Sequence, residues 1–184
     1  MLTKKNATMT NPFEFKKTTH HILREYENNS THLLHINTGR NVILKIDKHA
    51  IDLTDQSSKS LIVPHFLLEC RKLLYKGNGQ LILAGGLYKN KFVIYDIFEF
   101  NGMSTCNFTL LERIDLLKEL YSPEPSHTYF LRINENIVMA EFYHDNFTNH
   151  YKEIKRYNNS ICRVCIREKR KSISDTKIFW EIKF

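Results

Sequence analysis

Apolar and polar positions alternate in two different ways along this chain, and the two patterns separate helices from strands. Residues 64–75 and 110–121 carry apolar side chains at helical spacing, and Pro64 suits the first turn of a helix. Short apolar runs between Gly, Asn and Lys turns indicate strands. The pattern predicts helices at 20–29, 64–75, 110–121 and 147–157, and strands at 33–36, 42–46, 50–54, 80–87, 91–98, 128–133, 137–141, 160–167 and 177–184.

The order of these elements predicts an α+β fold with a mainly antiparallel sheet, because pairs of neighbouring strands are separated by helices. The turn residues 38–40 predict a hairpin between the first two strands. Residues 1–17 have the composition of a polar N-terminal arm, and nothing in residues 18–184 marks an interior boundary. A chain of 184 residues therefore predicts one domain with a substantial core.

Composition and charge narrow the functional classes. Apolar residues make up 42% of the chain, with only 6 Gly and 4 Pro, which is typical of a globular protein and argues against a disordered one. The formal charge of +7 indicates either a polyanionic partner or simply a solvated basic surface. No membrane span or secretory signal is recognisable, which favours an intracellular protein, cytoplasmic or nuclear. The many Asn, Lys and Ile residues are compatible with an AT-rich genome, viral or otherwise.

The cysteines do not predict a metal site. Cys70 and Cys106 stand alone, and Cys162 and Cys165 form a single C-x-x-C within an alternating, strand-like stretch. Side chains at that spacing point to opposite faces of a strand, so ordinary strand cysteines are the expected interpretation. No metal-ligating residue is assigned.

Two adjacent segments carry a family resemblance. Residues 91–102 form an apolar strand that reaches Tyr95-Asp96 and ends at Asn101-Gly102, and a helix containing Glu112-Arg113 follows. This block resembles one from the superfamily of mRNA-capping guanylyltransferases and ATP-dependent polynucleotide ligases.

Further segments resemble the other motifs of that superfamily in the same order, over residues 33–184. Residues 45–48 (Lys-Ile-Asp-Lys) stand where the family has its nucleophile motif, Lys-x-Asp-Gly. The others are Ser58-Lys59 for a Ser-Arg/Lys pair, residues 84–87 for Asp-Gly-Glu, residues 162–167 for Glu-Gly-Val-x-Ile-Arg/Lys, and residues 181–183 for the closing Lys-x-Lys.

The resemblance implies two mainly antiparallel sheets flanking a nucleotide cleft, with helices outside. In the family a lysine amine attacks the α-phosphate of ATP or GTP with Mg²⁺, so Lys45 would be the nucleophile. Tyr95 would stack on the base, and Arg167 and Lys183 would meet phosphate oxygens. The implied nucleotide-binding residues are Lys45, Asp47, Lys59, Tyr95, Arg167 and Lys183.

Several family positions are changed. Lys48 replaces the glycine of the nucleophile motif, Gly86 and Cys162 replace two glutamates, and Glu181 reverses the charge of a lysine. The printed chain ends after the closing motif, so no C-terminal oligonucleotide-binding-fold domain is expected. These losses predict a degenerate domain with little or no catalysis that binds a nucleotide, a nucleic acid or a protein partner.

Two alternatives stay open. One is a minimal active guanylyl- or adenylyltransferase that forms a Lys45–nucleotide intermediate and uses Glu99, Glu112 or Glu141 in place of the missing carboxylates. The other is an unrelated basic α+β binding module. A basic set near the C-terminus also predicts salt-sensitive RNA or DNA binding, although residues 168–172 fit a solvated turn equally well. That set is Arg156, Arg163, Lys169, Arg170 and Lys171.

Overall fold

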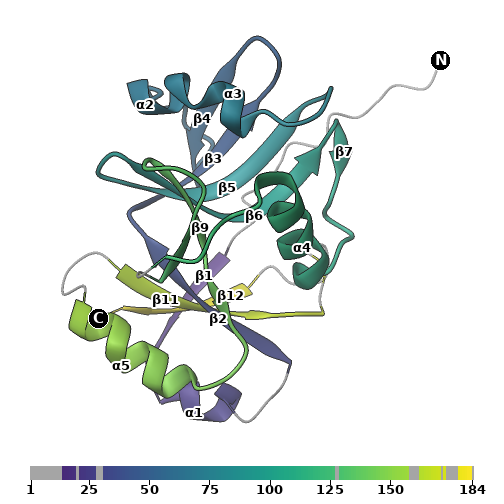
Figure 1. Ribbon diagram of the computed structural model, residues 1–184. Helices are drawn as coiled ribbons and strands as arrows, with labels where there is room; N and C mark the ends of the chain where they lie inside the picture. The colour runs from purple at the N-terminus through teal and green to yellow at the C-terminus, as the bar shows by residue number, and fades with distance from the viewer. Residues whose placement is uncertain are drawn as a thin grey trace.

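Two β-sheets, each covered by helices on its outer face, form the described part of the chain (Figure 1). The computed structural model describes residues 14–19, 21–27, 31–126, 129–157, 162–170, 172 and 178–183. The α+β class predicted from the pattern is confirmed. Most strand pairs are antiparallel, as expected, with parallel pairs at β1–β12 and β6–β9.

Sheet A has the order β1-β12-β11-β2-β10. The helices α1 and α5 cover its outer face, which lies at the bottom of Figure 1. Leu34 and Ile36 of β2 meet Phe147 and Ile154 of α5 in a buried apolar cluster there. The bounds are β1 Glu14–Thr18, α1 Ile22–Glu27, β2 His32–Thr38, β10 Phe142–Tyr143, α5 Phe147–Tyr157, β11 Cys162–Glu168 and β12 Ile178–Lys183.

Sheet B has the order β4-β3-β5-β6-β9-β8, with β7 beside β6. Leu44, Leu83 and Phe92 from this sheet pack against Ile114 and Leu117 of α4 in the larger core. The bounds are β3 Arg40–Ile46, β4 Ile51–Asp55, α2 His65–Glu69, α3 Arg71–Leu74, β5 Leu81–Tyr88, β6 Lys91–Phe100, β7 Met103–Ser104, α4 Leu110–Tyr121, β8 Phe130–Arg132 and β9 Ile137–Ala140.

The predicted hairpin between the first two strands is wrong. β2 belongs to sheet A and β3 to sheet B, so the chain passes from one sheet to the other between Thr38 and Arg40. Gly39 makes this passage possible, because its φ is +73° and a Cβ there would lie 1.9 Å from the carbonyl oxygen of Leu87. The sequence shows the turn, but the turn alone does not reveal that its two strands have different partners.

Two further elements differ from their predictions. The single helix predicted at 64–75 is divided into α2 and α3 at Cys70, whose ψ of 0° departs from helical values. Residues 14–17, assigned to the polar arm, belong to β1, which pairs with β12. This pairing satisfies backbone groups of β12 that would otherwise form an open sheet edge. The division of the chain into one arm and one domain stays a prediction.

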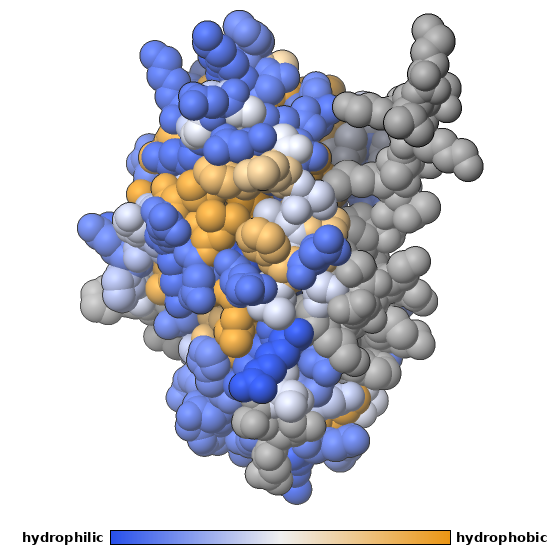
Figure 2. Space-filling view, turned by 90° about the vertical axis from the view of Figure 1, so that its right-hand side faces the viewer, coloured by the Kyte–Doolittle hydropathy of each residue, from blue (hydrophilic) through white to orange (hydrophobic). Residues whose placement is uncertain are grey.

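The surface on the α4 side combines apolar and hydrophilic residues. Figure 2 shows apolar surface near the middle of this face, with hydrophilic residues around it. In the described ranges, no helix is long and apolar enough to cross a membrane.

Candidate functional site

Polar side chains meet in part of the layer between the two sheets, beside the apolar Leu33 and Phe142 of sheet A. Leu34 and Ile36 of β2 face the helices, whereas His35 and Asn37 alternate with them and face sheet B. On the neighbouring strand β11, Arg167 reaches across to sheet B in the same way. We call the residues that meet here the polar layer: His35, Asn37, Asn41, Tyr95, Asp96 and Arg167.

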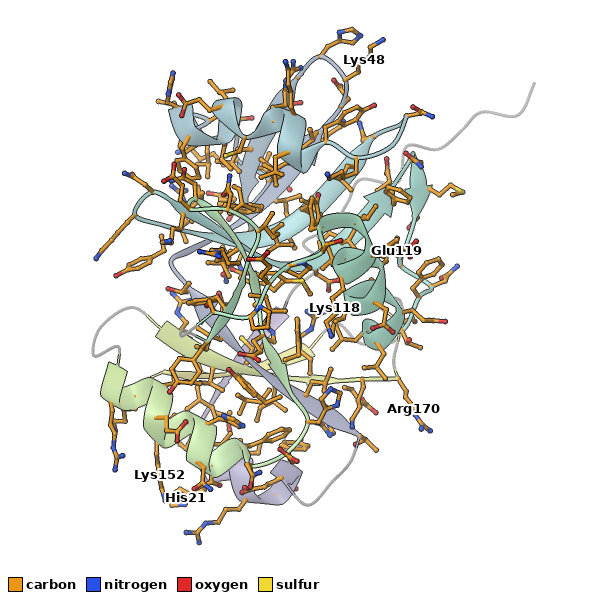
Figure 3. The ribbon with its side chains drawn as sticks, viewed as in Figure 1. His21, Lys48, Lys118, Glu119, Lys152 and Arg170 are labelled. Atoms are coloured by element: carbon orange, nitrogen blue, oxygen red, sulfur yellow. The ribbon has the colours of Figure 1, made fainter. Side chains whose placement is uncertain are left out.

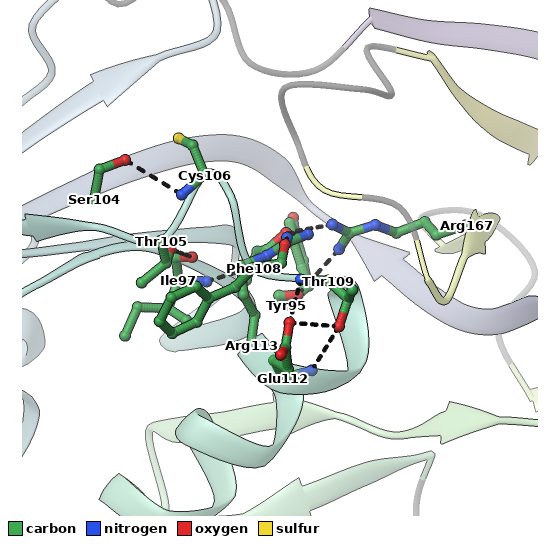
Figure 4. Close-up of polar contacts among 11 residues, drawn as sticks. Tyr95, Ile97, Ser104, Thr105, Cys106, Phe108, Thr109, Glu112, Arg113 and Arg167 are labelled. Atoms are coloured by element: carbon green, nitrogen blue, oxygen red, sulfur yellow. Dashed lines mark hydrogen bonds and ion pairs between the residues drawn. The ribbon is translucent and has the colours of Figure 1, made fainter.

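Asp96 is the charged centre of the polar layer, and Figure 4 shows the two arginines that pair with it, Arg113 and Arg167. One carboxylate oxygen accepts hydrogen bonds from Arg113 Nε at 2.7 Å and from the Ile97 amide at 2.8 Å. The other oxygen pairs with Arg167, and all three charged residues are at most 4% exposed. Burial alone would raise the pKa of Asp96, but Arg167 and Arg113 outweigh burial and hold this pKa below its ordinary value.

The Glu-Arg pair that opens α4 has a structural explanation. The Glu112 carboxylate accepts from the Thr109 amide at 2.7 Å, and the Thr109 hydroxyl accepts from the Glu112 amide at 3.3 Å. This capping box fixes the first turn of α4, and the next residue, Arg113, then reaches Asp96. The segment that carries the family resemblance therefore joins β6, α4 and sheet A through one buried carboxylate.

Tyr95 is 3% exposed, and its hydroxyl lies 2.9 Å from Asn37 Oδ1 and 2.8 Å from Asn41 Oδ1. These two contacts connect β6 to β2 and to β3. The His35 ring lies between the Tyr95 ring, at 5.8 Å between centroids, and the Phe142 ring, at 4.8 Å. Both the ring and the hydroxyl of Tyr95 thus contact other residues of the protein.

His35 is 2% exposed and neutral at physiological pH. Burial, and then the charge of Arg167, lower its pKa to about 3. Nδ1 lies 3.0 Å from the Ile36 carbonyl, so Nδ1 carries the proton and Nε2 is an acceptor. Within the described residues, His35 Nε2, Asn37 Nδ2 and Thr38 Oγ1 are buried and have no hydrogen-bond partner.

Gly86, which stands where the family has a glutamate, lies against this layer. A Cβ at Gly86 would lie 2.0 Å from the Thr38 carbonyl oxygen and 2.6 Å from the Tyr95 hydroxyl. Real side chains do not approach this closely, so the position holds no residue larger than glycine without a shift of the backbone.

Lys45 lies apart from the polar layer. It is exposed near the end of β3, four residues beyond Asn41, which corresponds to about 13 Å along the strand. It lines a hollow of about 450 Å³ together with Ile43, Leu53 and Ile82. In the amide orientation that satisfies both neighbours, Gln80 accepts from Lys45 Nζ at 3.2 Å and donates to Glu99 at 3.1 Å.

A second, smaller hollow opens beside the polar layer. It measures about 250 Å³ and is lined by Arg40 and Asn41 of β3, Asp55 at the end of β4, Gln56 just after it, and Arg163 of β11. Arg40 is paired with Asp55 at 2.9 Å. Neither Lys45 nor Tyr95 lines this hollow, and a shared nucleotide site for these two residues stays a prediction.

The remaining predicted nucleotide-binding residues are dispersed. The Asp47 carboxylate accepts hydrogen bonds from the His49 and Ala50 amides at 2.7 and 2.8 Å. These bonds close the β3–β4 turn and lower the pKa of Asp47. Lys59 is exposed in the loop after β4, where its amide donates to Asp55. The backbone of Lys183 pairs with Arg163, but its side chain lies outside the described residues.

The predicted nucleic-acid set is also divided. Arg163 lies near the start of β11 and Lys169 directly after its end, about 20 Å away along the strand direction. Arg156 is exposed near the end of α5, and Arg170 is exposed in the turn after β11. Lys171 lies outside the described residues.

The sequence interpretation missed His35, Asn37 and Asn41 as members of the site. Their signal is weak: a His and an Asn within an apolar strand, and an Asn beside a glycine, are common in proteins. Their importance emerges only once β2, β3 and β6 meet around the Tyr95 hydroxyl.

Known proteins resemble this chain in structure and not in sequence. No protein-family model matches it, and a search of curated proteins finds no match. A solved structure of mycobacterial DNA ligase D complexed with ATP and MES matches with a TM-score of 0.64 at 12% identity, over 96% of this chain. The ligase domain of M. tuberculosis LigD matches with a TM-score of 0.62 at 12% identity, over 90% of this chain.

The match covers only part of those proteins. This chain spans 61% of the first ligase chain and 56% of the second. At 12% identity, the comparison concerns the course of the backbone and not the chemistry of the side chains. The chain therefore has the α+β fold of DNA-ligase nucleotidyltransferase domains, as the motif order predicts.

Proposed function

We propose that this chain is a degenerate capping-enzyme- or ligase-like nucleotidyltransferase domain that acts as a binding module, with little or no nucleotidyl transfer. The closed polar layer carries the proposal. The family resemblance implies a nucleotide between the sheets, and in this chain His35, Asn37 and Tyr95 contact one another there. The residues present therefore do not fit ATP or GTP with Mg²⁺ in that position.

Base stacking is the first function that the polar layer opposes. A base needs an open ring face, whereas Tyr95 is 3% exposed and its hydroxyl contacts two asparagines. Opening the layer would separate buried polar groups from their partners, which costs free energy for each lost hydrogen bond. Nucleotide affinity at this position is accordingly expected to be weak.

The missing carboxylate is the second obstacle. Gly86 lacks the family's glutamate, and the Thr38 carbonyl occupies the space that any side chain would need. A carboxylate that handles ribose or metal therefore has no route into the layer from this position. Restoring it would require moving β2 relative to β5.

The nucleophile is the third obstacle. Lys45 lines a separate hollow beside Glu99, away from Tyr95. In our proposal the Lys-x-Asp-Gly spacing corresponds in space to residues 35–38, His-Ile-Asn-Thr, because this segment brings both His35 and Asn37 against Tyr95. The strand of Lys45, β3, contacts Tyr95 through Asn41, four residues before Lys45. His35 would then replace the lysine, and Asn37 the aspartate. A buried neutral imidazole offers neither an ammonium charge nor access to an α-phosphate.

The minimal active enzyme is less well supported, because the three candidate carboxylates do not converge. Glu99 lies beside Gln80 near Lys45, and its pKa is raised, chiefly by burial. Glu112 closes the capping box of α4. Glu141 accepts from the Tyr143 hydroxyl at 2.9 Å. Each of the three carboxylates interacts with its own neighbour, and the three pairs lie in different parts of the fold.

Intact-protein mass spectrometry tests the proposal directly. The protein is incubated with ATP or GTP and with Mg²⁺ or Mn²⁺, and the mass is then recorded under conditions that preserve a phosphoamide. We expect no adenylate or guanylate increment above a metal-free control. Lys45→Ala is compared with Lys48→Ala, a matched exposed lysine three residues away.

An increment that disappears in Lys45→Ala and persists in Lys48→Ala would establish Lys45 as a nucleophile and overturn the proposal. An increment that persists in both variants but disappears in His35→Gln would also overturn it, with His35 as the reacting residue.

A further inference from the structure

We propose that a basic corner of the molecule, formed by Lys118, His144, Lys169 and Arg170, binds the phosphate backbone of a nucleic acid. These residues come from α4, from the link between β10 and α5, and from the turn after β11. The corner does not include the polar layer. The inference therefore does not rest on whether the chain binds or transfers a nucleotide.

Strand pairing brings His144 and Lys169 to the same edge of sheet A, because β10 and β11 both run antiparallel to β2 and end near its start. Burial, then Lys169, then Lys118 lower the pKa of His144, and Asp145 opposes them with a smaller effect. Lysines from two separate elements thus act on one imidazole more strongly than the acidic residue beside it. A site of this kind attracts an anion.

The backbone holds Lys169 in place. The Lys169 amide donates to the Thr31 carbonyl at 2.8 Å, and the Lys169 carbonyl accepts from the Leu111 amide at 3.2 Å. The turn after β11 is thereby attached both to the start of β2 and to the first turn of α4. A backbone that is already held in place loses less conformational freedom when the ligand arrives.

The charged groups are accessible. Lys118, His144 and Arg170 are exposed, and Lys169 is partly exposed. Figure 3 shows Lys118 on α4 and Arg170 in the same part of the molecule, with Lys48 at the top and Lys152 at the bottom. The two distant lysines therefore provide matched controls for the corner.

The corner fits a hydrated phosphate backbone better than a lipid surface or an acidic protein. Of the large apolar side chains exposed in the described residues, Ile62, Leu68 and Met103 lie on other elements. Phe108 is a single apolar residue near the corner, next to Thr109, which bridges to Ser172. A membrane-binding site combines cations with inserted apolar groups, and a protein interface has an apolar centre. Nucleic-acid interfaces are polar and strongly cationic.

Phosphate binding should also take up a proton. A phosphate placed between Lys118 and Lys169 opposes the charges that disfavour imidazolium, so it raises the pKa of His144 in the complex. Binding should strengthen as pH falls from about 7.5 to 5.5, because protonation then adds one more cation.

Fluorescence anisotropy tests the proposal with a labelled 12-nucleotide single strand and its duplex, titrated from low to moderate salt. The double variant Lys118→Gln/Lys169→Gln is compared with Lys48→Gln/Lys152→Gln, which loses the same charge elsewhere. For the single strand we expect the salt slope of the affinity to fall by about 1.4 in the corner variant, at about 0.7 for each phosphate contact. We expect the slope of the control variant to be unchanged. Thermal unfolding confirms that both variants fold.

Several results would overturn the proposal. These are an absence of binding at low salt, an equal loss in both double variants, or binding to anionic phospholipid vesicles without binding to either oligonucleotide. His144→Gln should remove the rise in affinity below pH 7, and an unchanged pH dependence would exclude His144 from the site. A failure here would leave the mass-spectrometric test of nucleotidyl transfer unaffected.

Discussion

Asp96 illustrates how one residue joins distant parts of this fold. Its carboxylate is inaccessible to water, and it receives a guanidinium from α4 and another from β11. A buried ion pair contributes little over an apolar replacement of both partners. Removing only one partner is costly, because the other charges stay buried without compensation. The sequence pair Tyr95-Asp96 therefore has a role that requires no ligand.

Replacing Asp96 with asparagine should destabilise the protein by about 3–5 kcal/mol at neutral pH, because two buried arginines lose their counter-charge. Since the folded-state pKa of Asp96 is depressed, this contribution is present above the unfolded pKa and is lost as pH falls through the folded pKa. The difference between wild type and Asp96→Asn should thus shrink below about pH 4. Urea unfolding at several pH values measures it.

Asp145→Asn serves as the control for that series. This side chain is exposed, so its removal should change the free energy of unfolding by no more than about 0.5 kcal/mol. If Asp96→Asn lowered the free energy of unfolding as little as the control does, the two buried arginines would not depend on the charge of Asp96.

At the scale of elements, α4 depends on its N-terminal cap to place Arg113. The Thr109 hydroxyl accepts from the Glu112 amide, and the Glu112 carboxylate accepts from the Thr109 amide. Thr109→Ala removes half of this box and should cost about 1 kcal/mol in urea unfolding. Thr109→Ser keeps the hydroxyl and should retain most of the stability. Equal losses in both variants would show that the hydroxyl does not act as the cap.

Elements with a strong local pattern were predictable from the sequence, and their partners were not. Periodic apolar residues identified α4, a helix was also expected at α5, and apolar runs identified β5 and β6. The first turn was also recognised, but Gly39 passes the chain to a second sheet instead of closing a hairpin. A turn that closes a hairpin and a turn that passes the chain to another sheet use the same local residues. The difference depends on which distant strands pair with each of the two strands that the turn connects.

The candidate site shows the same limit. The spacing Lys-x-Asp placed the nucleophile at Lys45, and that assignment stays a prediction. In the fold, Tyr95 meets His35 and Asn37 of β2 and also Asn41 of β3, which stands four residues before Lys45. A motif match of two or three residues does not distinguish neighbouring strands, because the contacts to Tyr95 form only when both sheets have assembled.

At the scale of the whole molecule, polar contacts hold the two sheets together where β5 crosses β2. The two strands lie so close at this crossing that no side chain fits between them. Gly86 of β5 lies against the Thr38 carbonyl of β2, and the Tyr95 hydroxyl connects β6 to both β2 and β3. An open cleft between the sheets would remove these contacts. Whether the cleft opens is therefore a testable property of this protein.

Gly86→Ala tests the closed arrangement. An added Cβ would lie 2.0 Å from the Thr38 carbonyl oxygen, so β2 and β5 must move apart and the polar layer must reorganise. We expect a loss of about 3 kcal/mol or more in urea unfolding, comparable with that of other overpacked cores. Gly102→Ala is the control, because no atom lies within 4 Å of its Cβ and only its φ of +75° is strained, at about 1 kcal/mol. If Gly86→Ala costs no more than Gly102→Ala, the sheets separate readily and the cleft is open in solution. In that case a nucleotide has access to Tyr95, and the proposal of a domain with little or no nucleotidyl transfer loses its main support.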